Sequence, residues 1–436
     1  GDIDLTAGAL NLGDLASGGS VTATATAGDA GFGTVNAADA IIIAATGTPT
    51  LANALSGGNS SITGASVTLS NADIGGSLAL RATTGDVDGN GLVTVGGAIT
   101  LDAAGNIGFG SLNAAGGAFA ATAGGNVGGT SLAAATGIAI TSGRDIVLTR
   151  MNAANGDIAL AAQTTIAVDH AEASGSFTAA TPGNISTGLN SIITGGDIVI
   201  NAGGLVNLGN SSAGGLIDIT AGQIDYASLL AAGSIALLVQ NTPTGQGNGN
   251  IAGGDTTATA GAIAATTGFG STILTGTTNA ATTLTVNAAG PASIGTAVSG
   301  GSTSITGASV TLNTGTIGGT LALNATAGDV DGTGTVLVGG GIDLDATGNI
   351  GFGELAAEGG AFTVDAGGNI SFTSATGSGD ISMNAAGTVS GGDLSAANAL
   401  TAAAARIAVA DASAANIAMT SGSDILFNSL TSPDAI

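Results

Sequence analysis

The stretch GDVDGNG, which ends at Gly91, has the residue types and spacing of a calcium-binding loop. Asp86, Asp88, Asn90 and Gly91 match the opening of an EF-hand loop. In such loops oxygen ligands alternate along a tight turn, because Ca²⁺ is a hard cation that prefers oxygen. The twelfth position of the loop would be Gly97, so the bidentate Glu of a complete EF-hand is missing.

The same loop occurs a second time, with acids at Asp329 and Asp331, where Thr333 stands in the place of Asn90. A Gly- and Asp-rich corner between two strands produces this pattern without any metal, since both residue types favour tight turns. We therefore expect no metal site and no cofactor. Calcium at Asp86, Asp88, Asn90, Asp329 and Asp331 is the alternative.

A second candidate for chemistry is the segment VDHAE, Val168–Glu172, which contains the only His of the chain. Asp169, His170 and Glu172 are residue types that carry general acid–base catalysis. The alternation of the surrounding strand, however, places Asp169 and His170 at an outward corner. No other segment contributes an evident basic partner, and a catalytic site needs converging groups in a cleft. We expect a protein that is not an enzyme.

The elements that would position these residues follow a short period. Segments such as GAITLDAAGNIGFGSLNAAGG, from Gly97, read as Gly, an apolar–x–apolar–x–Ala alternation, a Gly-rich corner and a second alternation. Period two is typical of β-strands, because successive side chains point to opposite faces. The leading apolar residues recur about every 19 residues, as expected for one solenoid turn. These residues are Ile3, Val21, Ile41, Ile62, Leu78, Ile99, Phe119, Ile138, Ile158, Phe177, Ile198, Ile217 and Ile235.

Short strands with Gly, Asn and Asp corners cannot bury their apolar side alone, whereas stacked coils can. The sequence therefore predicts an all-β fold, a right-handed parallel β-helix (β-solenoid) with about 20 residues per coil and about 22 coils. We expect residues 1–436 to form a single continuous β-solenoid. Residues 239–262 have little alternation and many turn formers, and we expect an irregular insertion or loop there.

A long repeat contains the short one, because residues 36–125 recur as residues 279–368 at a constant shift of 243 positions. This shift corresponds to about twelve whole coils. Between 96–117 and 339–360 the two copies differ at six positions, which in the first copy are Ala98, Thr100, Ala104, Ser111, Asn113 and Ala115. The alternation predicts that a different set faces inward: Ile99, Leu101, Ala103, Ile107, Phe109 and Leu112. The copies thus differ where we expect solvent.

Composition excludes several classes of protein. The chain of 436 residues has four Lys and Arg against 29 Asp and Glu, for a net charge of −25. Nucleic acids and anionic lipid surfaces are bound by Lys and Arg, so we expect neither as a partner. The chain contains no run of about 18 apolar residues, so the sequence predicts no membrane span. A mean hydropathy of +0.51 argues against disorder. We expect the acids to form a solubilising coat that discourages lateral association.

The GDIxLxA…GNIxxxxL…GG coils resemble the repeat shafts of filamentous-haemagglutinin-like exoproteins, and those of large autotransporter passengers. The resemblance implies secretion to the cell surface of a Gram-negative bacterium and a role in attachment, aggregation or biofilm. It transfers no adhesive residue. The expected function is a rod-like extracellular shaft and spacer. The alternatives are a self-assembling filament of stacked solenoids and, further off, a polysaccharide-degrading β-helix enzyme.

The expected partners follow from the solenoid and from the resemblance. The first coil, GDIDLTAG, and the last segment, TSPDAI, show no polar cap. Terminal strands without a cap expose backbone N–H and C=O groups. We therefore expect contact with further coils of the same parent chain or with end-to-end copies. Surface glycans or proteins of a host or of bacteria are the other expected partners.

Overall fold

The computed structural model describes residues 1–188, 192–240 and 249–432. These residues form an all-β solenoid of parallel strands, with about 22 turns that are about 19 residues apart, and they contain no helix. The predicted fold class is confirmed. The chain consists of two compact units, Gly1–Gly215 and Leu216–Ile436, and each unit is described by itself.

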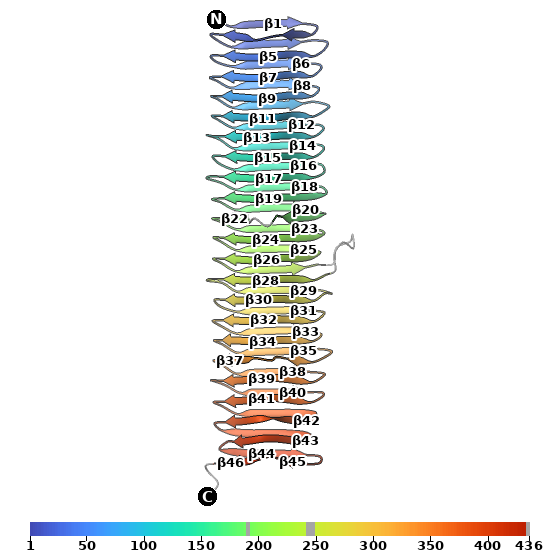
Figure 1. Ribbon diagram of the computed structural model, residues 1–436, viewed down its shortest axis with the longest axis vertical. Coiled ribbons are helices and arrows are strands. Elements are labelled where there is room, and N and C mark those ends of the chain that lie inside the picture. Colours follow the sequence, from blue (N-terminus) through green and yellow to red (C-terminus); the bar gives the residue numbers. More distant parts are fainter. Residues whose placement is uncertain (189–191, 241–248, 433–436) are drawn as a thin grey trace. The chain divides into compact units, whose positions relative to one another are not determined.

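In the first unit a short strand and a long strand follow each other in most turns, and each pairs with the strand of its own kind in the adjacent turn (Figure 1). Its strands are β1 Ile3–Ala7, β2 Leu10–Leu12, β3 Leu15–Ser17, β4 Val21–Ala25, β5 Ala30–Ala37, β6 Ile41–Ala45, β7 Pro49–Ser56, β8 Ser60–Gly64, β9 Val67–Ile74, β10 Leu78–Ala82, β11 Val87–Val95, β12 Ile99–Ala103, β13 Ile107–Ala114, β14 Phe119–Ala123, β15 Val127–Ala134, β16 Ile138–Ser142, β17 Ile146–Ala153, β18 Ile158–Ala162, β19 Thr165–Ala173, β20 Phe177–Thr181, β21 Asn184–Thr187, β22 Ile192–Thr194, β23 Ile198–Ala202 and β24 Leu205–Ala213.

The second unit repeats this arrangement (Figure 1). Its strands are β25 Ile217–Ala221, β26 Gln223–Ala231, β27 Ile235–Val239, β28 Ile251–Ala258, β29 Ile263–Thr267, β30 Thr272–Ala280, β31 Leu284–Ala288, β32 Ala292–Ser299, β33 Thr303–Gly307, β34 Val310–Ile317, β35 Leu321–Ala325, β36 Val330–Asp331, β37 Thr335–Val338, β38 Ile342–Ala346, β39 Ile350–Ala357, β40 Phe362–Ala366, β41 Ile370–Gly377, β42 Ile381–Ala396, β43 Ala399–Ser413, β44 Asn416–Ser421, β45 Ile425–Leu426 and β46 Ser429–Thr431.

One turn consists of a short strand and a long strand, as β12 and β13 show. The five residues of β12 alternate strictly between buried and exposed. In β13 the alternation shifts by one residue at Gly110 and Ser111, which are both outside the core. Because side chains alternate with period two, this shift would turn the inward side chains of the second half away from the core if the strand were straight. Both halves face the core, so the strand bends between them. Each turn therefore has three sides and three corners.

Inward positions form columns that continue from turn to turn. Ile99 is paired with Leu78 on one side and Phe119 on the other, and each of the three is at most 1% exposed. Burial of each such side chain contributes about 1.5–3 kcal/mol. The prediction of the inward face is confirmed, since the six positions assigned to the core are all buried: Ile99, Leu101, Ala103, Ile107, Phe109 and Leu112. None of the six positions at which residues 96–117 and 339–360 differ is buried.

Some aromatic side chains in the core lie beside a glycine of the adjacent turn. Phe109 is paired with Gly129, and a Cβ atom on Gly129 would collide with the Phe109 ring. Tyr226 and Gly253 show the same relation in the second unit. Adjacent strands are only about 4.8 Å apart, so a ring that leans toward its neighbour needs the space of an absent side chain. The glycines are thus part of the core packing.

One predicted leading residue is wrong, because Ser60 rather than Ile62 is in register with Ile41. Ser60 is 3% exposed, and its hydroxyl lies 2.8 Å from the Ser56 hydroxyl. Ser56 in turn donates to the carbonyl oxygen of Gly58 at 3.0 Å. A buried hydroxyl is tolerated when it has a partner. Hydropathy alone could not find a polar residue at an inward position.

The predicted irregular segment 239–262 divides into two parts. Residues 241–248 lie outside the described residues. Ile251–Ala258, by contrast, is the regular strand β28, which pairs with β26 and β30. The interpretation of this second part as irregular is therefore wrong. The right-handed sense of the coil and the continuity of residues 1–436 as one solenoid stay predictions.

Candidate functional site

The first candidate calcium ligand, Asp86, accepts hydrogen bonds at a corner of the solenoid. Its Oδ1 atom accepts from the backbone N–H of Asn106 at 2.6 Å and from the side-chain amide of Asn106 at 3.2 Å. Asp329 accepts the same two bonds from Asn349, at 2.6 and 3.2 Å. The corner N–H groups point along the stack and lie outside the regular strand pairing, so an acceptor in the previous turn satisfies them.

These bonds continue as a ladder through the following turns. Asn106 Oδ1 accepts from the N–H of Asn126 at 2.8 Å, and Asn126 Oδ1 accepts from that of Asp145 at 3.2 Å. Asp145 Oδ1 then accepts from the hydroxyl of Thr165 at 2.7 Å and from its N–H at 3.1 Å. The hydroxyl of Thr165 is the main cause that holds the pKa of Asp145 below its usual value. We name Asp86, Asn106, Asn126, Asp145 and Thr165 the corner ladder.

Acids at other corners make the same kind of contact. Each accepts a hydrogen bond from a backbone N–H of the next turn, and they are Asp2, Asp14, Asp29, Asp157, Asp255 and Asp380. A hydrogen bond to a charged acceptor contributes about 1.5–3 kcal/mol. These acids therefore help to hold adjacent turns together. The interpretation of the acids as a solubilising coat does not include this structural role.

The remaining candidate ligands point outward. Asp88 and Asp331 are exposed strand residues that follow the corner acids. Partial burial raises the pKa of Asp88, and the nearby Asp86 carboxylate raises it further; Asp331 has its pKa raised in the same way by burial and by Asp329. In residues 1–188, 192–240 and 249–432 no three His, Cys, Asp or Glu side chains gather where they could hold a metal ion. The repeated GDVDG pattern is explained by the corners.

The candidate catalytic residues lie on the outer surface of β19. Asp169 is exposed, whereas His170 and Glu172 are half-buried. His170 is in register with Arg150 of β17, a basic neighbour that sequence analysis does not identify. The structure thus brings a cation beside His170. It leaves both side chains on an outward face of the solenoid.

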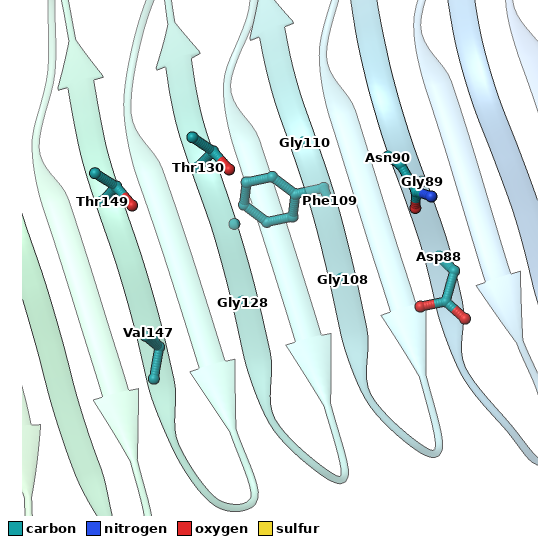
Figure 2. Close-up of a pocket in the computed structure, with 11 residues that line it drawn as sticks. Asp88, Gly89, Asn90, Gly108, Phe109, Gly110, Gly128, Thr130, Val147 and Thr149 are labelled. Atoms are coloured by element: carbon teal, nitrogen blue, oxygen red, sulfur yellow. The ribbon is translucent and has the colours of Figure 1, made fainter.

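Sequence analysis also does not identify a surface groove of about 600 Å³ in the first unit. Residues of four consecutive long strands, β11, β13, β15 and β17, line it, and they include the edge of the buried Phe109 ring beside Gly129 (Figure 2). The lining residues are Asp88, Gly89, Asn90, Gly108, Phe109, Gly110, Gly128, Gly129, Thr130, Val147 and Thr149. We call this feature the glycine groove.

Two glycines in register explain why the glycine groove exists. Gly108 and Gly128 are paired with each other, and they lie between Asp88 of β11 and Val147 of β17. With no side chain on two successive turns, the strand surface is lower there than at its flanks (Figure 2). The only signal in the sequence is a glycine directly after the first apolar residue of the long strand, in GNIGFG and GNVGGT.

Side chains with complementary chemistry surround this floor. The Asp88 carboxylate and the Asn90 amide lie at one end (Figure 2). The hydroxyls of Thr130 and Thr149 and the 54% exposed Val147 lie on the other strands. These groups offer hydrogen-bond donors and acceptors beside an apolar surface, which suits reversible binding of a polar, uncharged ligand.

A second hollow, of about 430 Å³, lies on the side of the solenoid formed by the later halves of the long strands. It is bordered by the exposed Leu55 and Leu92. Asn53 and Asn71 are hydrogen-bonded to each other along its floor, at 3.3 Å. Its polar groups are thus already used by neighbouring turns, which makes it the weaker candidate for a binding site.

Comparison with protein family models, with curated proteins and with solved structures finds no match to this chain. None of the described residues belongs to a helix long and apolar enough to cross a membrane. The functional interpretation therefore depends on the chain's own geometry.

Proposed function

We propose that this chain is a non-enzymatic, extracellular shaft of a bacterial surface adhesin, similar to the filamentous-haemagglutinin-like exoproteins of Gram-negative bacteria. In this role it is a rod-like spacer that holds a binding part away from the cell and supports attachment, aggregation or biofilm. One observation carries the proposal. The hydrogen bonds that join one turn to the next recur in both copies of the long repeat, as those of Asp86 with Asn106 and of Asp329 with Asn349 show.

The corner bonds support a structural role more than a catalytic one. The carboxylate of Asp86 accepts from the backbone of the adjacent turn, and that of Asp329 does the same in the second copy. A catalytic carboxylate needs free access to its substrate. Acids that are held in this way stabilise the stack instead.

Charge supports a shaft that stays separate along its sides. With 29 acids and four cations, neighbouring shafts repel each other at low salt. Each turn presents backbone groups along the stacking direction, so further turns of the same kind are the partners we propose at its ends. Surface glycans or proteins are the partners we propose for attachment.

Negative-stain imaging of the purified protein tests the proposal. A continuous stack of about 22 turns at about 4.8 Å per turn would measure about 105 Å. We expect single rods of that length, well separated on the grid. Long filaments whose length grows with protein concentration would favour the self-assembling alternative. Compact particles without a long axis would contradict both.

A matched pair of chimaeras tests the role as a spacer. Residues 36–125 are replaced by residues 279–368, and the chain is displayed between a membrane anchor and a tip domain of known ligand. We expect unchanged attachment through the tip, because the two segments have the same length and match position for position. Deletion of residues 38–134 is the control, since it removes five whole turns and shortens the spacer without changing the strand register. Equal attachment by the deletion variant would argue against a spacer.

A further inference from the structure

Most glycines at the corners of this solenoid are required by close packing, but two glycines of the groove are not. A Cβ atom on Gly105 or Gly110 would collide with the preceding turn. A Cβ on Gly128, by contrast, would meet nothing closer than the carbonyl oxygen of Val147, at 3.8 Å. A Cβ on Gly108 would meet only the end of the Asp88 side chain, at 3.2 Å.

The backbone does not require glycine at these positions either. Among the described residues, positive φ angles occur only at Gly249 and Gly360. Gly108 and Gly128 are ordinary strand residues, and glycine weakens a strand because it loses more conformational entropy and packs no side chain. Glycine within a strand often marks a place where a ligand approaches the backbone closely.

The second unit shows that a side chain is compatible with this place in the turn. Gly351 corresponds to Gly108, and its neighbour in the next turn is Ser371, at the position of Gly128. Ser371 lies in the regular strand β41. The open floor is therefore a property of this place in the first unit and not of the fold.

The backbone pairing and the charge of the groove select the class of ligand. Gly108 and Gly128 already pair with the strands on both sides, so an added peptide strand finds no free backbone groups there. No Lys or Arg lines the groove, and Asp88 carries negative charge. This composition disfavours phosphate, nucleic acid and acidic polysaccharides.

We propose that the glycine groove binds a neutral oligosaccharide, with the face of a sugar ring on the floor formed by Gly108 and Gly128. At one end the Asp88 carboxylate accepts hydrogen bonds from sugar hydroxyls, and the Asn90 amide both donates and accepts. The hydroxyls of Thr130 and Thr149 on the other strands also donate and accept. The exposed methyl groups of Val147 contact the C–H face of a ring. A chain of sugars fits because the groove spans four successive turns.

Saturation-transfer difference NMR on the full chain tests the site, with cellohexaose, laminarihexaose, maltohexaose and mannohexaose as neutral probes. Hexagalacturonate is the anionic probe. We expect at least one neutral probe to bind in the micromolar to millimolar range and the anionic probe not to bind. Gly128→Gln, which fills the floor, is expected to weaken binding at least about tenfold. Asp88→Ala is expected to weaken it as well.

Gly31→Gln is the matched control, because Gly31 is also an outward strand glycine with room for a Cβ and lies outside the groove. It should bind as the unchanged protein does, and both glutamine variants should melt at the same temperature. The inference is overturned if no neutral probe binds at about 10 mM. Equal binding by Gly128→Gln and Gly31→Gln would overturn it too. The proposal of a shaft is tested by imaging and would survive either result.

Discussion

The two copies of the duplicated segment have the same corner bonds and different outer surfaces. Asp86 and Asn106 are joined at 2.6 Å in the first copy, as are Asp329 and Asn349 in the second. Thr100, which faces solvent, becomes Asp in the second copy. The difference teaches that the corners and the core define the turn, whereas the outward strand positions are free to acquire a function.

The buried polar contacts follow the same rule. Ser56 and Ser60 lie 2.8 Å apart in the first copy, and Ser299 and Thr303 lie 2.8 Å apart in the second. Ser56 and Ser299 each also donate to a carbonyl oxygen, of Gly58 and of Gly301, whereas Ser60 and Thr303 depend on the pair for a partner.

Just beyond the copies the cores diverge. Gly128 and Gly129 of the first unit correspond to Ser371 and Phe372 of the second. Phe372 does not crowd its neighbours, because Gly391 in the following turn leaves room for its ring. The second unit therefore keeps Phe352 at the place of Phe109 and accommodates a further ring in the next turn, beside a glycine.

The largest expected effect separates the inner face from the outer face of a single strand. Ile99→Asp buries an unpaired charge at a position that is 0% exposed, and we expect a loss of at least about 3 kcal/mol of unfolding free energy. Thr100→Asp should change stability by less than about 0.5 kcal/mol, because the second copy has Asp343 there. Chemical denaturation of both variants measures this. Similar losses in the two variants would refute the strand register.

A smaller effect is expected from Gly129→Ala, which places a methyl group against the Phe109 ring. Overpacking of this kind costs about 1–3 kcal/mol. Adding Phe109→Leu in the same chain should recover part of the loss, because it removes the atoms that collide. Thermal melting of the single and double variants measures both. Additive losses would show that the ring and the glycine are not coupled.

Thr278→Val is expected to stabilise the second unit by about 1 kcal/mol. The Thr278 hydroxyl is buried without a hydrogen-bond partner, and Val35 occupies the corresponding place in the first unit. Thr256→Val is the control, because its hydroxyl lies 2.7 Å from that of Tyr226, which burial gives a pKa of about 12. Denaturation should show a gain for the first variant and a loss for the second. A loss for Thr278→Val would mean that its hydroxyl is satisfied.

The smallest effect concerns pH. Asp145 has its folded pKa lowered, chiefly by the Thr165 hydroxyl, so its contribution to stability is present above the unfolded pKa and is lost as pH falls through the folded value. Asp88 has its pKa raised, so its contribution has the opposite sign and is lost as pH rises through the folded value. Carboxyl NMR should show Asp145 titrating at lower pH than Asp88. In Thr165→Val the pKa of Asp145 should rise, and an unchanged value would rule out the hydroxyl as its cause.

The fold was predictable because it repeats. The period-two alternation recurs at a nearly constant spacing along the chain. It therefore reveals inward residues such as Ile99 even though no single turn is distinctive. The prediction of Ile62 as the leading residue of its turn was wrong, because that place is taken by the polar Ser60. Hydropathy does not reveal that Ser56 is the hydrogen-bond partner of Ser60. It was also wrong for Ile251–Ala258, whose Gly and Thr residues suggested turns but pair as a regular strand.

The candidate site was not predictable in the same way. The sequence places Gly105 at a corner and Gly128 within a strand, but it does not show whether a side chain would fit at either position. Only the position of neighbouring atoms distinguishes a glycine that close packing requires from one that leaves an open surface. The role of Asp86 was hidden for a related reason, because its partner Asn106 is a full turn away.

The direction of the hydrogen bonds between turns determines how such a chain responds to force. In each unit the strand pairing and the corner ladder join one turn to the next along the stacking direction. A load applied along that direction acts mainly on the bonds of a single interface between turns. When that interface opens, a turn of about 20 residues lengthens from about 4.8 Å to roughly 65 Å. The stack would thus extend in discrete steps and dissipate work at each step, which limits the peak tension that reaches either end.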